Sequence, residues 1–404
     1  MSRILKLTEW RTSQPLRLTS AERAGLERHF DASIASGPTA DTFLVTPTNV
    51  IGTMRVGDTD VLVTPKIPID RVLFMVAYAR DPMNWKDDWA RLAGTKDLVD
   101  GIAALFVHTS DRVLSRGLYR SYRRVEDNEL AVRGRIRWQQ QARRPAPLPL
   151  AVRYDVHDDD VRENQVIRAA LAVLRHMRLG DPAVAAGIAR LWRDFKDLTA
   201  LAAPARAFNS VAWNRQNEHY RPLIDLAGVI LHGTMTELDD GALSVPGFTL
   251  SMPRVFEQFV RTVLREQSGF TPAELPDAPA EHGLRFDTAG RVRLLPDIGV
   301  RINDRWIFLG DVKYKRDDGR GRDGDLYQLL AYATAAGLSE ATLIYADGPA
   351  EAPHHTVRHS AIRINLLHLD LSQPPNLVLS QLKKLRVPSR QSGETRVTAR
   401  SGAP

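Results

Sequence analysis

No cysteine occurs among the 404 residues of this chain. A disulfide framework and a zinc site built on thiolates are therefore excluded, and nothing indicates an oxidising compartment. No apolar run approaches the roughly 20 residues that a helix needs to cross a membrane, and the start, MSRILKLTEWRTSQ, lacks the apolar core of a signal peptide. We expect a globular, cytoplasmic protein that has no membrane partner.

The chain also lacks a Gly-x-x-x-x-Gly-Lys-Ser/Thr loop. Since that loop holds the phosphates of the nucleotide in many ATPases and GTPases, we do not expect this chain to hydrolyse a nucleoside triphosphate unaided. Any step that is driven by nucleotide hydrolysis therefore requires a partner protein.

Charge is present in only modest excess. Lys and Arg number 55 against 48 Asp and Glu, a net charge of +7, which has the sign expected for a partner made of phosphates but does not establish one. Residues 101–150 hold ten arginines against four acids, so this segment alone contributes 10 − 4 = +6. The segment is either a solvated basic helix face with a loop, or a surface that contacts phosphates or a partner.

The apolar content of 43% predicts a large core divided over two or three domains. Short runs of Val, Ile and Thr broken by turn residues make residues 1–75 β-rich, and apolar residues at three- and four-residue intervals then predict helices. We divide the chain into a β-rich and helical part over 1–150, a helical part over 151–245, a domain over 246–372 and a tail over 373–404, whose end we expect to be disordered.

The domain over 246–372 has its own order of elements. A helix from about Ser251 to Gly269 is followed by three strands, a second helix over GDLYQLLAYATAAG and two more strands. This order predicts a mixed sheet flanked by helices, which is the arrangement of the restriction-endonuclease-like core. The whole chain is expected to be α/β, with an α+β character overall.

Three residues of this domain indicate metal chemistry. Asp297 follows a proline, and Asp311 and Lys313 stand at the end of the next strand-like run. Two carboxylates at the ends of adjacent strands can hold a divalent cation through hard oxygen ligands, while the lysine orients or activates the attacking water. The spacing is that of a metal-dependent phosphodiesterase site.

Three further residues extend this candidate site. Gln328 and Tyr332 lie one helix turn apart in DLYQLLAYA, downstream of Lys313. Glu257 is the one acid in its apolar stretch. It is either simply solvated or faces the metal as an extra carboxylate that binds a water.

Each of these residues also has a purely structural interpretation. An Asp after a strand is often only a turn former, and Pro276-Asp277 shows that the dipeptide recurs here without a strand pattern around it. The context favours Asp297, because strand-like runs and a helix surround it. A histidine cluster further on has metal-binding residue types but no site geometry, and we interpret it as surface: His354, His355 and His359.

At this point the motifs carry a resemblance. LLPDI, DVKYK and QLLAY resemble the PD-(D/E)xK nuclease superfamily with the Gln-x-x-x-Tyr addition of its RecB-like members. Over most of residues 45–370 the chain is similar to one branch, the McrC family, the nuclease subunit of the McrBC modified-cytosine restriction system. Segments that fall in the order of that family are VGDTDVLVTPKI, RGRI, YDVHDDDVRENQVI, NEHYRPLIDLAGVIL and VFEQFV.

The resemblance implies a Mg²⁺-dependent DNA endonuclease, with Mn²⁺ as an alternative metal. Asp297 and Asp311 would bind the metal and Glu257 would complete its environment. Lys313 would position the water and stabilise developing charge.

The resemblance also implies partners. In that family the amino-terminal part docks into the central channel of a hexameric AAA+ GTPase, McrB, and stimulates its hydrolysis, while the carboxy-terminal part cuts DNA. Gln328 and Tyr332 would support the site or touch the DNA backbone. The loop Lys315 to Asp325 is either a mobile DNA-contacting segment or merely solvated. Cutting both strands with one site per chain commonly needs a homodimer through the nuclease domain.

Two other functions stay open. The chain could be a mainly non-catalytic activator of an AAA+ motor that acts through its basic residues 101–150. It could also be a stand-alone RecB-like exonuclease or repair nuclease that needs no GTPase. The modified base that is recognised, and whether the partner uses GTP or ATP, do not follow from this sequence.

Overall fold

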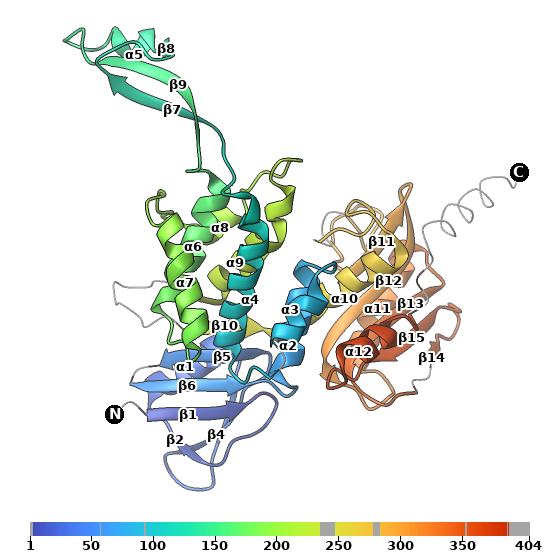
Figure 1. Cartoon of the computed structure of the whole chain (residues 1–404). Coiled ribbons are helices and arrows are strands. Elements are labelled where there is room, and N and C mark those ends of the chain that lie inside the picture. The colour runs from blue at the N-terminus through green and yellow to red at the C-terminus, as the bar shows by residue number, and fades with distance from the viewer. Residues whose placement is uncertain are drawn as a thin grey trace, which may run out of the picture. The chain divides into compact units, whose positions relative to one another are not determined.

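The computed structural model describes residues 3–56, 58–92, 94–234, 247–277, 283–351, 354–385 and 387. Helices and strands both contribute, so the expected α/β class is confirmed. No helix within these ranges has both the length and the apolar content that a bilayer span requires. The chain forms two compact units, one from residues 1–101 and 247–404 and the other from residues 102–246 (Figure 1).

The first unit begins with strands, as the Val-, Ile- and Thr-rich runs predict. A four-stranded sheet has the order β1 (Arg3–Thr8), β6 (Thr59–Thr64), β5 (Val50–Val56) and β10 (Phe248–Ser251). A smaller sheet has the order β2 (Leu16–Arg17), β4 (Thr42–Thr46) and β3 (Ser33–Ser36). Because β10 pairs with β5, the chain returns to its amino-terminal sheet after the second unit, so the compact units cut across the predicted division at 150 and 246.

Helices of the first unit follow the apolar periodicity, with one exception. They are α2 (Ile69–Arg80), α3 (Trp85–Leu92) and α10 (Met252–Ser268). The exception is α1 (Ser20–Phe30), which the sequence analysis missed because it has few apolar residues and buries only Glu22, Leu26 and Phe30. Its signal was the capping box of Thr19 and Glu22, in which each side chain bonds the other residue's backbone N–H.

The predicted mixed sheet of the carboxy-terminal domain is confirmed. Its order is β11 (Ile298–Ile302), β12 (Arg305–Arg316), β13 (Glu340–Asp347), β15 (Arg363–His368) and β14 (His354–Thr356). β11 and β12 are antiparallel, whereas β13 is parallel to both β12 and β15. The first of the three strands expected after this helix, LRFDT (residues 284–288), is not formed as a strand, and Arg285 there makes an isolated bridge with Arg293.

Two helices lie on opposite faces of β12. α11 (Asp323–Ala336) packs Leu329 and Tyr332 into one apolar cluster with Leu343 of β13. On the other face, Phe256 of α10 contacts Tyr314 of β12, with 6.0 Å between ring centroids. After the sheet, α12 (Pro375–Leu382) occupies part of the expected tail, and the stretch from 388 onward lies outside the described residues.

The second unit combines helices with an extended arm. Its helical elements are α4 (Leu98–Val113, which begins in the first unit), η1 (Leu114–Arg116), α6 (Arg162–His176), α7 (Pro182–Phe195), α8 (Pro204–Phe208), η2 (Glu218–Tyr220) and α9 (Arg221–Thr234). The arm, residues 121–158, consists of β7 (Ser121–Glu129), β8 (Arg135–Ile136), α5 (Trp138–Gln141) and β9 (Leu150–Asp158). Figure 1 shows it projecting beyond α6 and α8 of the same unit.

The arm corrects the expectation of a basic helix face within 101–150. β7 and β9 pair antiparallel from Ser121 opposite Asp158 to Glu129 opposite Leu150. Almost no side chain of β7 is buried, so the strand carries no alternation of apolar and polar residues by which it could be predicted. Seven of the ten arginines lie on this arm: Arg123, Arg124, Arg133, Arg135, Arg137, Arg143 and Arg144.

Candidate active site

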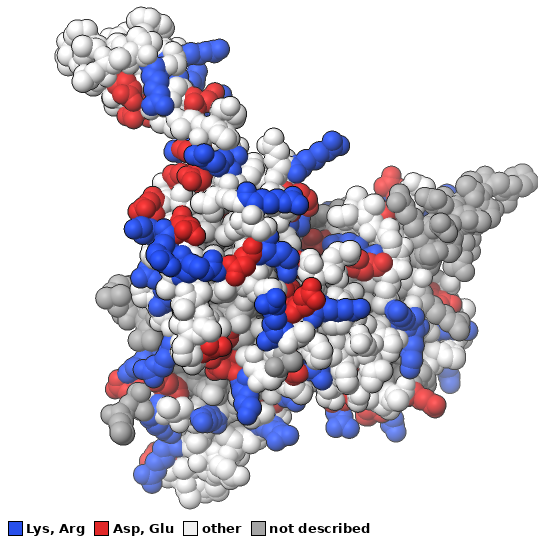
Figure 2. Space-filling model, viewed as in Figure 1, with Lys and Arg blue, Asp and Glu red and all other residues white. Residues whose placement is uncertain are grey.

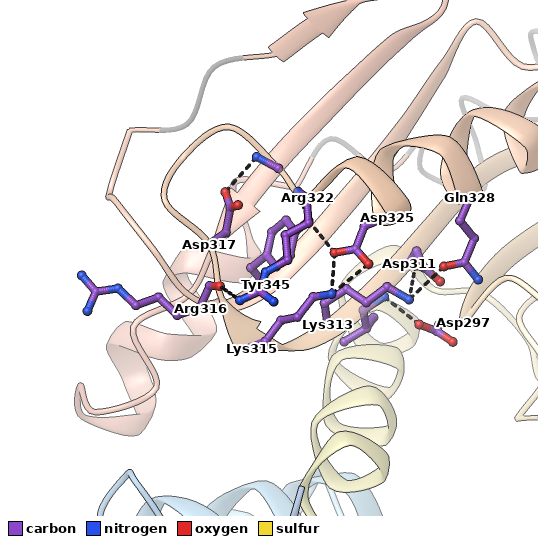
Figure 3. A network of polar contacts seen from close by, with 12 residues as sticks. Asp297, Asp311, Lys313, Lys315, Arg316, Asp317, Arg322, Asp325, Gln328 and Tyr345 are labelled. Atoms are coloured by element: carbon purple, nitrogen blue, oxygen red, sulfur yellow. Dashed lines mark hydrogen bonds and ion pairs between the residues drawn. The ribbon is translucent and has the colours of Figure 1, made fainter. Parts of the chain in front are cut away.

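Asp297 and Asp311 come together through the pairing of β11 with β12. Ile298 lies opposite Gly310 in the antiparallel register, so Asp297, one residue earlier, stands beside Asp311. The carboxylate of Asp297 accepts a hydrogen bond through Oδ2 from the backbone N–H of Val312, at 2.8 Å. The hairpin thus fixes the two acids at the same edge of the sheet (Figure 3).

The carboxylate of Asp311 is buried and poorly satisfied. Asp311 is 1% exposed, and its Oδ1 has no hydrogen-bond partner. Oδ2 instead makes an ion pair with Nζ of Lys313 at 2.5 Å. Burial, reinforced by the negative charge of Asp297, raises the pKa of Asp311 to about 7. Burial also raises the pKa of Asp297, and the negative charge of Glu257 adds to this shift.

Lys313 keeps its charge at this site. Burial lowers the pKa of Lys313, but the carboxylates of Asp311 and Asp297 raise it by more, so the net shift is upward. An ammonium with a raised pKa remains protonated at neutral pH. It can therefore stabilise negative charge, whereas it cannot serve as a general base.

Gln328 and Tyr332 connect Lys313 to the segment that leads into Asp297. Nζ of Lys313 donates to Oε1 of Gln328 at 3.2 Å, and Nε2 of Gln328 donates to the hydroxyl of Tyr332 at 2.8 Å. That hydroxyl donates to the carbonyl oxygen of Leu295 at 3.3 Å. The helical spacing of Gln328 and Tyr332 thus places both beside the lysine, from α11.

Glu257 is held by Arg261, one turn later on α10. The guanidinium makes an ion pair with Glu257 and donates to the carbonyl oxygens of Asp297, at 2.7 Å, and Asp277, at 2.8 Å. The Glu257 side chain is 28% exposed, and its charge contributes to the raised pKa of Asp297. Glu257 therefore lies near the two acids, but its own charge is balanced by an arginine.

A second layer of polar contacts lies further along β12 (Figure 3). Nζ of Lys315 lies 2.9 and 2.8 Å from the two carboxylate oxygens of Asp325 on α11. The hydroxyl of Tyr345 donates to Oδ2 of Asp325 at 2.8 Å. Because Lys315 is engaged in this way, Lys313 is the lysine of β12 that faces the paired acids.

The loop after β12 is anchored rather than merely solvated. Asp317 accepts hydrogen bonds from the backbone N–H groups of Gly319, at 2.9 Å, and Gly321, at 3.1 Å, and lies 2.9 Å from Nε2 of His368. Asp317 and His368 are both buried. The loop that carries Arg320 therefore has a defined path.

On the opposite face of β12 lies another buried carboxylate. Glu9 is fully buried, and its Oε2 accepts from the hydroxyl of Tyr314 and the N–H of Lys66, both at 3.2 Å. Burial raises the pKa of Glu9 to about 7. The ammonium of Lys66 lies 4.3 Å from the centroid of the Tyr314 ring.

The paired acids suit a hard divalent cation. Asp311 offers its Oδ1, which has no hydrogen bond, and Asp297 offers its second oxygen. Within the described ranges no group of three or more His, Asp or Glu side chains forms a metal site. Mg²⁺ is commonly held by one or two carboxylates with waters and phosphates completing the shell, so two acids are sufficient.

The histidine cluster that the sequence analysis interpreted as surface contributes no ligand to this site. His354 and His359 are exposed, and a ring nitrogen of His355 lies 2.6 Å from the carbonyl oxygen of Arg320. The sequence analysis missed Arg261 and Asp325. The first could have been found from its i, i+4 spacing to Glu257, whereas Asp325 opens α11 like an ordinary helix-start acid.

Comparison with known proteins identifies a family and a fold. A family model described as "McrBC 5-methylcytosine restriction system component" matches residues 45–346. No curated protein matches. The chain is similar to a refined half-complex from the tetradecameric assembly of Thermococcus gammatolerans McrB AAA+ hexamers with bound McrC, at a TM-score of 0.52 and 16% identity, over 94% of this chain and 98% of that chain. The chain is also similar to a cryo-EM structure of the Thermococcus gammatolerans McrBC complex, at a TM-score of 0.43 and 18% identity, over 66% of this chain and 89% of that chain.

Proposed function

This chain belongs to the McrBC 5-methylcytosine restriction system component family, and from that premise we propose that it is the Mg²⁺-dependent DNA endonuclease subunit of such a system. The site formed by β11 and β12 cleaves DNA when an AAA+ GTPase partner activates the chain, and the chain stimulates GTP hydrolysis by that partner. In this proposal the sheet and its motif residues serve as a PD-(D/E)xK nuclease core.

One observation carries this proposal. Asp311 is a buried carboxylate side by side with a second carboxylate, and the single ammonium of Lys313 beside it cannot balance both charges, so the arrangement is costly unless a ligand compensates it. A divalent cation held by Asp297 and Asp311 removes the cost, because it neutralises both charges. When bound, Mg²⁺ or Mn²⁺ supplies a polarised phosphate oxygen and a more acidic water.

The surrounding residues have distinct proposed roles. Lys313, which is cationic at 2.5 Å from Asp311, stabilises the negative charge that develops on the phosphate and orients the attacking water. Gln328 and Tyr332 hold the ammonium in place. Glu257, balanced by Arg261, acts through a bound water or through the position of Asp297 rather than as a direct metal ligand.

The arm supports the proposed interaction with an AAA+ ring. Large apolar side chains project into solvent along it: Tyr122 at 76% exposure, Leu130 at 77%, Val132 at 64% and Trp138 at 69%. Positively and negatively charged side chains also lie along the arm (Figure 2). Aromatic residues and arginines together are characteristic of protein interfaces, and the similar solved structure holds McrC bound to McrB AAA+ hexamers.

Substitution of Asp297 by Ala tests the nuclease proposal. We expect cleavage of modified DNA with the partner and Mg²⁺ to be lost, while stimulation of the partner's GTPase survives, because Asp297 lies in the sheet and not on the arm. Loss of both activities would mean that the carboxylate is structural.

Two outcomes would favour the alternatives. Wild-type protein that stimulates the partner but never cuts DNA would be an activator, a function favoured by the exposed apolar residues of the arm. Cleavage of unmodified DNA by this chain with Mg²⁺ alone would indicate a stand-alone nuclease.

A further inference from the structure

We propose that the hairpin of residues 284–294 holds the DNA duplex beside the active site, an inference that rests on the proposed nuclease function. Arg285 and Arg293 contact the phosphate backbone, and Phe286 and Val292 pack into the groove between the strands.

The hairpin is a short, well-bonded ribbon. Leu294 donates its N–H to the carbonyl of Leu284 at 3.0 Å, and Phe286 donates to the carbonyl of Val292 at 3.0 Å. Its turn is closed by Asp287, whose Oδ1 accepts from the N–H of Arg291 at 2.7 Å. The ribbon therefore has fixed rungs that pair 284 with 294, 285 with 293 and 286 with 292.

An apolar stripe on one face of this ribbon continues past the core. Leu284 is 4% exposed and belongs to the same apolar cluster as Leu329 and Tyr332. Two residues further along the chain, on the same face of the hairpin, Phe286 is 60% exposed, and Val292 opposite it is 50% exposed. The base of the hairpin is thus anchored under α11, while its outer rung presents two apolar side chains to solvent. Proteins that grip DNA through a groove insert side chains of this kind as wedges.

The other face of the ribbon carries two like charges directly opposite each other. Arg285 and Arg293 form an antiparallel bridge, and like-charged pairs at such positions are destabilising. Neither makes an ion pair with an acid in the described part of the chain, whereas the neighbouring Arg291 pairs with Asp287 at 3.0 Å. A polyanion removes the repulsion, because successive phosphates can contact both guanidinium groups.

The chain path places this surface near the reacting phosphate. Leu294 is followed by Leu295, whose carbonyl accepts from Tyr332, and then by Pro296 and Asp297. Val292 lies five positions before Asp297, so the two cannot lie more than roughly 17 Å apart. That reach corresponds to about five base pairs of duplex. DNA bound in the active site therefore has its neighbouring base pairs within reach of the hairpin.

Two double variants of the full chain test the inference. Binding of a fluorescein-labelled duplex is measured by anisotropy over a salt series, with Ca²⁺ in place of Mg²⁺. R285Q/R293Q should reduce the slope of log affinity against log salt by roughly 2 × 0.9, or about 1.8, because two phosphate contacts are lost. F286A/V292A should weaken binding about tenfold and leave that slope unchanged. It should also abolish a rise in the fluorescence of 2-aminopurine that the wild type causes near the cleavage position.

Matched controls keep these results specific. K383Q/K384Q removes two exposed charges next to α12, and Leu377→Ala removes a side chain of α12 that is 50% exposed. Neither should change affinity or slope by as much as the hairpin variants. Equal effects from the controls would overturn the assignment.

The outcomes also separate this inference from the proposed function. Wild-type protein that neither binds nor cuts DNA overturns both. Wild-type protein that cuts, with hairpin variants that bind and cut like it, overturns the hairpin assignment alone. A change in the sedimentation of DNA-free F286A/V292A, with DNA affinity intact, identifies the apolar pair as a contact between copies of the chain and also overturns it.

Discussion

The sheet of β11 and β12 and the arm of residues 121–158 hold their charges in opposite ways. In the ion pair of Lys313 with Asp311 the side chains are 20% and 1% exposed, whereas in the pair of Arg124 with Asp155 on the arm they are 68% and 60% exposed. Buried charges interact strongly and are little screened, while exposed pairs contribute at most about 1 kcal/mol. Single residues should therefore decide what the sheet does, whereas on the arm apolar contacts should outweigh any one charge.

The largest effect in this comparison is expected from Lys313. Lys313→Ala removes the cation beside Asp311, and we expect DNA cleavage to fall on the order of 10³-fold, because stabilisation of developing charge is lost. Single-turnover cleavage with the partner and saturating Mg²⁺ measures this. Lys315→Ala is the matched control, since that lysine bonds Asp325 instead of the paired acids, and it should cost less than about tenfold. Equal losses would contradict the role of Lys313.

A smaller but still marked effect is expected on the arm. Trp138→Ala removes an exposed aromatic side chain, and we expect the concentration of this chain that half-maximally stimulates the partner's GTPase to rise about 30-fold, the effect of about 2 kcal/mol at an interface. Arg124→Ala, which breaks an exposed ion pair, should change it by less than about fivefold. The comparison fails if Arg124→Ala has the larger effect.

The sequence predicted the sheet far better than the arm, for a physical reason. Asp311 and Lys313 lie in β12 after its apolar residues 306–309, and burial of the strand leaves a run of this kind that can be recognised along the chain. Gln328 and Tyr332 were predicted to lie one helix turn apart, as they do on α11. Glu257 was left open between solvent and metal, because the sequence alone does not show that Arg261 balances its charge.

The arm gave no comparable signal. β7 has no buried residue and β9 buries only Ala151 and Val152, so neither strand carries the long apolar run of a core strand. The acidic run before the next helix, Asp158 to Asp160, is typical of a helix N-cap, but no such cap is formed. The N-cap of α6 is Val161, without a side-chain cap, and Asp160 instead accepts from the backbone and hydroxyl of Thr199, at 2.9 and 2.6 Å. Contacts between residues far apart in the sequence decided both cases.

A further effect is expected from Arg261, which holds Glu257 and the backbone of Asp297 in place. Arg261→Gln leaves Glu257 unbalanced and frees the carbonyl of Asp297, so the acids should be held less well. We expect about tenfold more Mg²⁺ to be needed for half-maximal cleavage, with a smaller change at saturating Mg²⁺. Arg265→Gln is the control, because that arginine lies one turn further and bonds Leu275 and Asp277. A loss of rate that saturating Mg²⁺ does not restore would contradict a role in metal binding.

The smallest predicted effect concerns stability and pH. Burial raises the pKa of Glu9 from 4.5 to about 7, so the folded protein binds a proton that the unfolded chain has released. The stability contributed by this proton is complete below pH 4.5 and is lost as the pH rises through 7. Glu9→Gln keeps an acceptor for Tyr314 and Lys66 but cannot ionise, so it should gain about 1 to 2 kcal/mol over the wild type between pH 5 and pH 8.

The free energy of unfolding is measured by chemical denaturation at a series of pH values, and two further variants serve as comparisons. Asp317→Asn should change this free energy in the opposite direction. Burial raises the pKa of Asp317, but its bonds with His368 and the loop lower it by more, so the net shift is downward. Its stabilising effect is therefore present above pH 3.8 and is lost in acid, and Asp317→Asn should be less stable than the wild type at neutral pH. Asp155→Asn on the arm should stay within about 0.5 kcal/mol at every pH, because its side chain is 60% exposed. If the free energy of unfolding of Glu9→Gln depends on pH in parallel with that of the wild type, Glu9 is ionised in the folded protein. If Asp155→Asn differs from the wild type by a large, pH-dependent amount, burial does not distinguish the two regions.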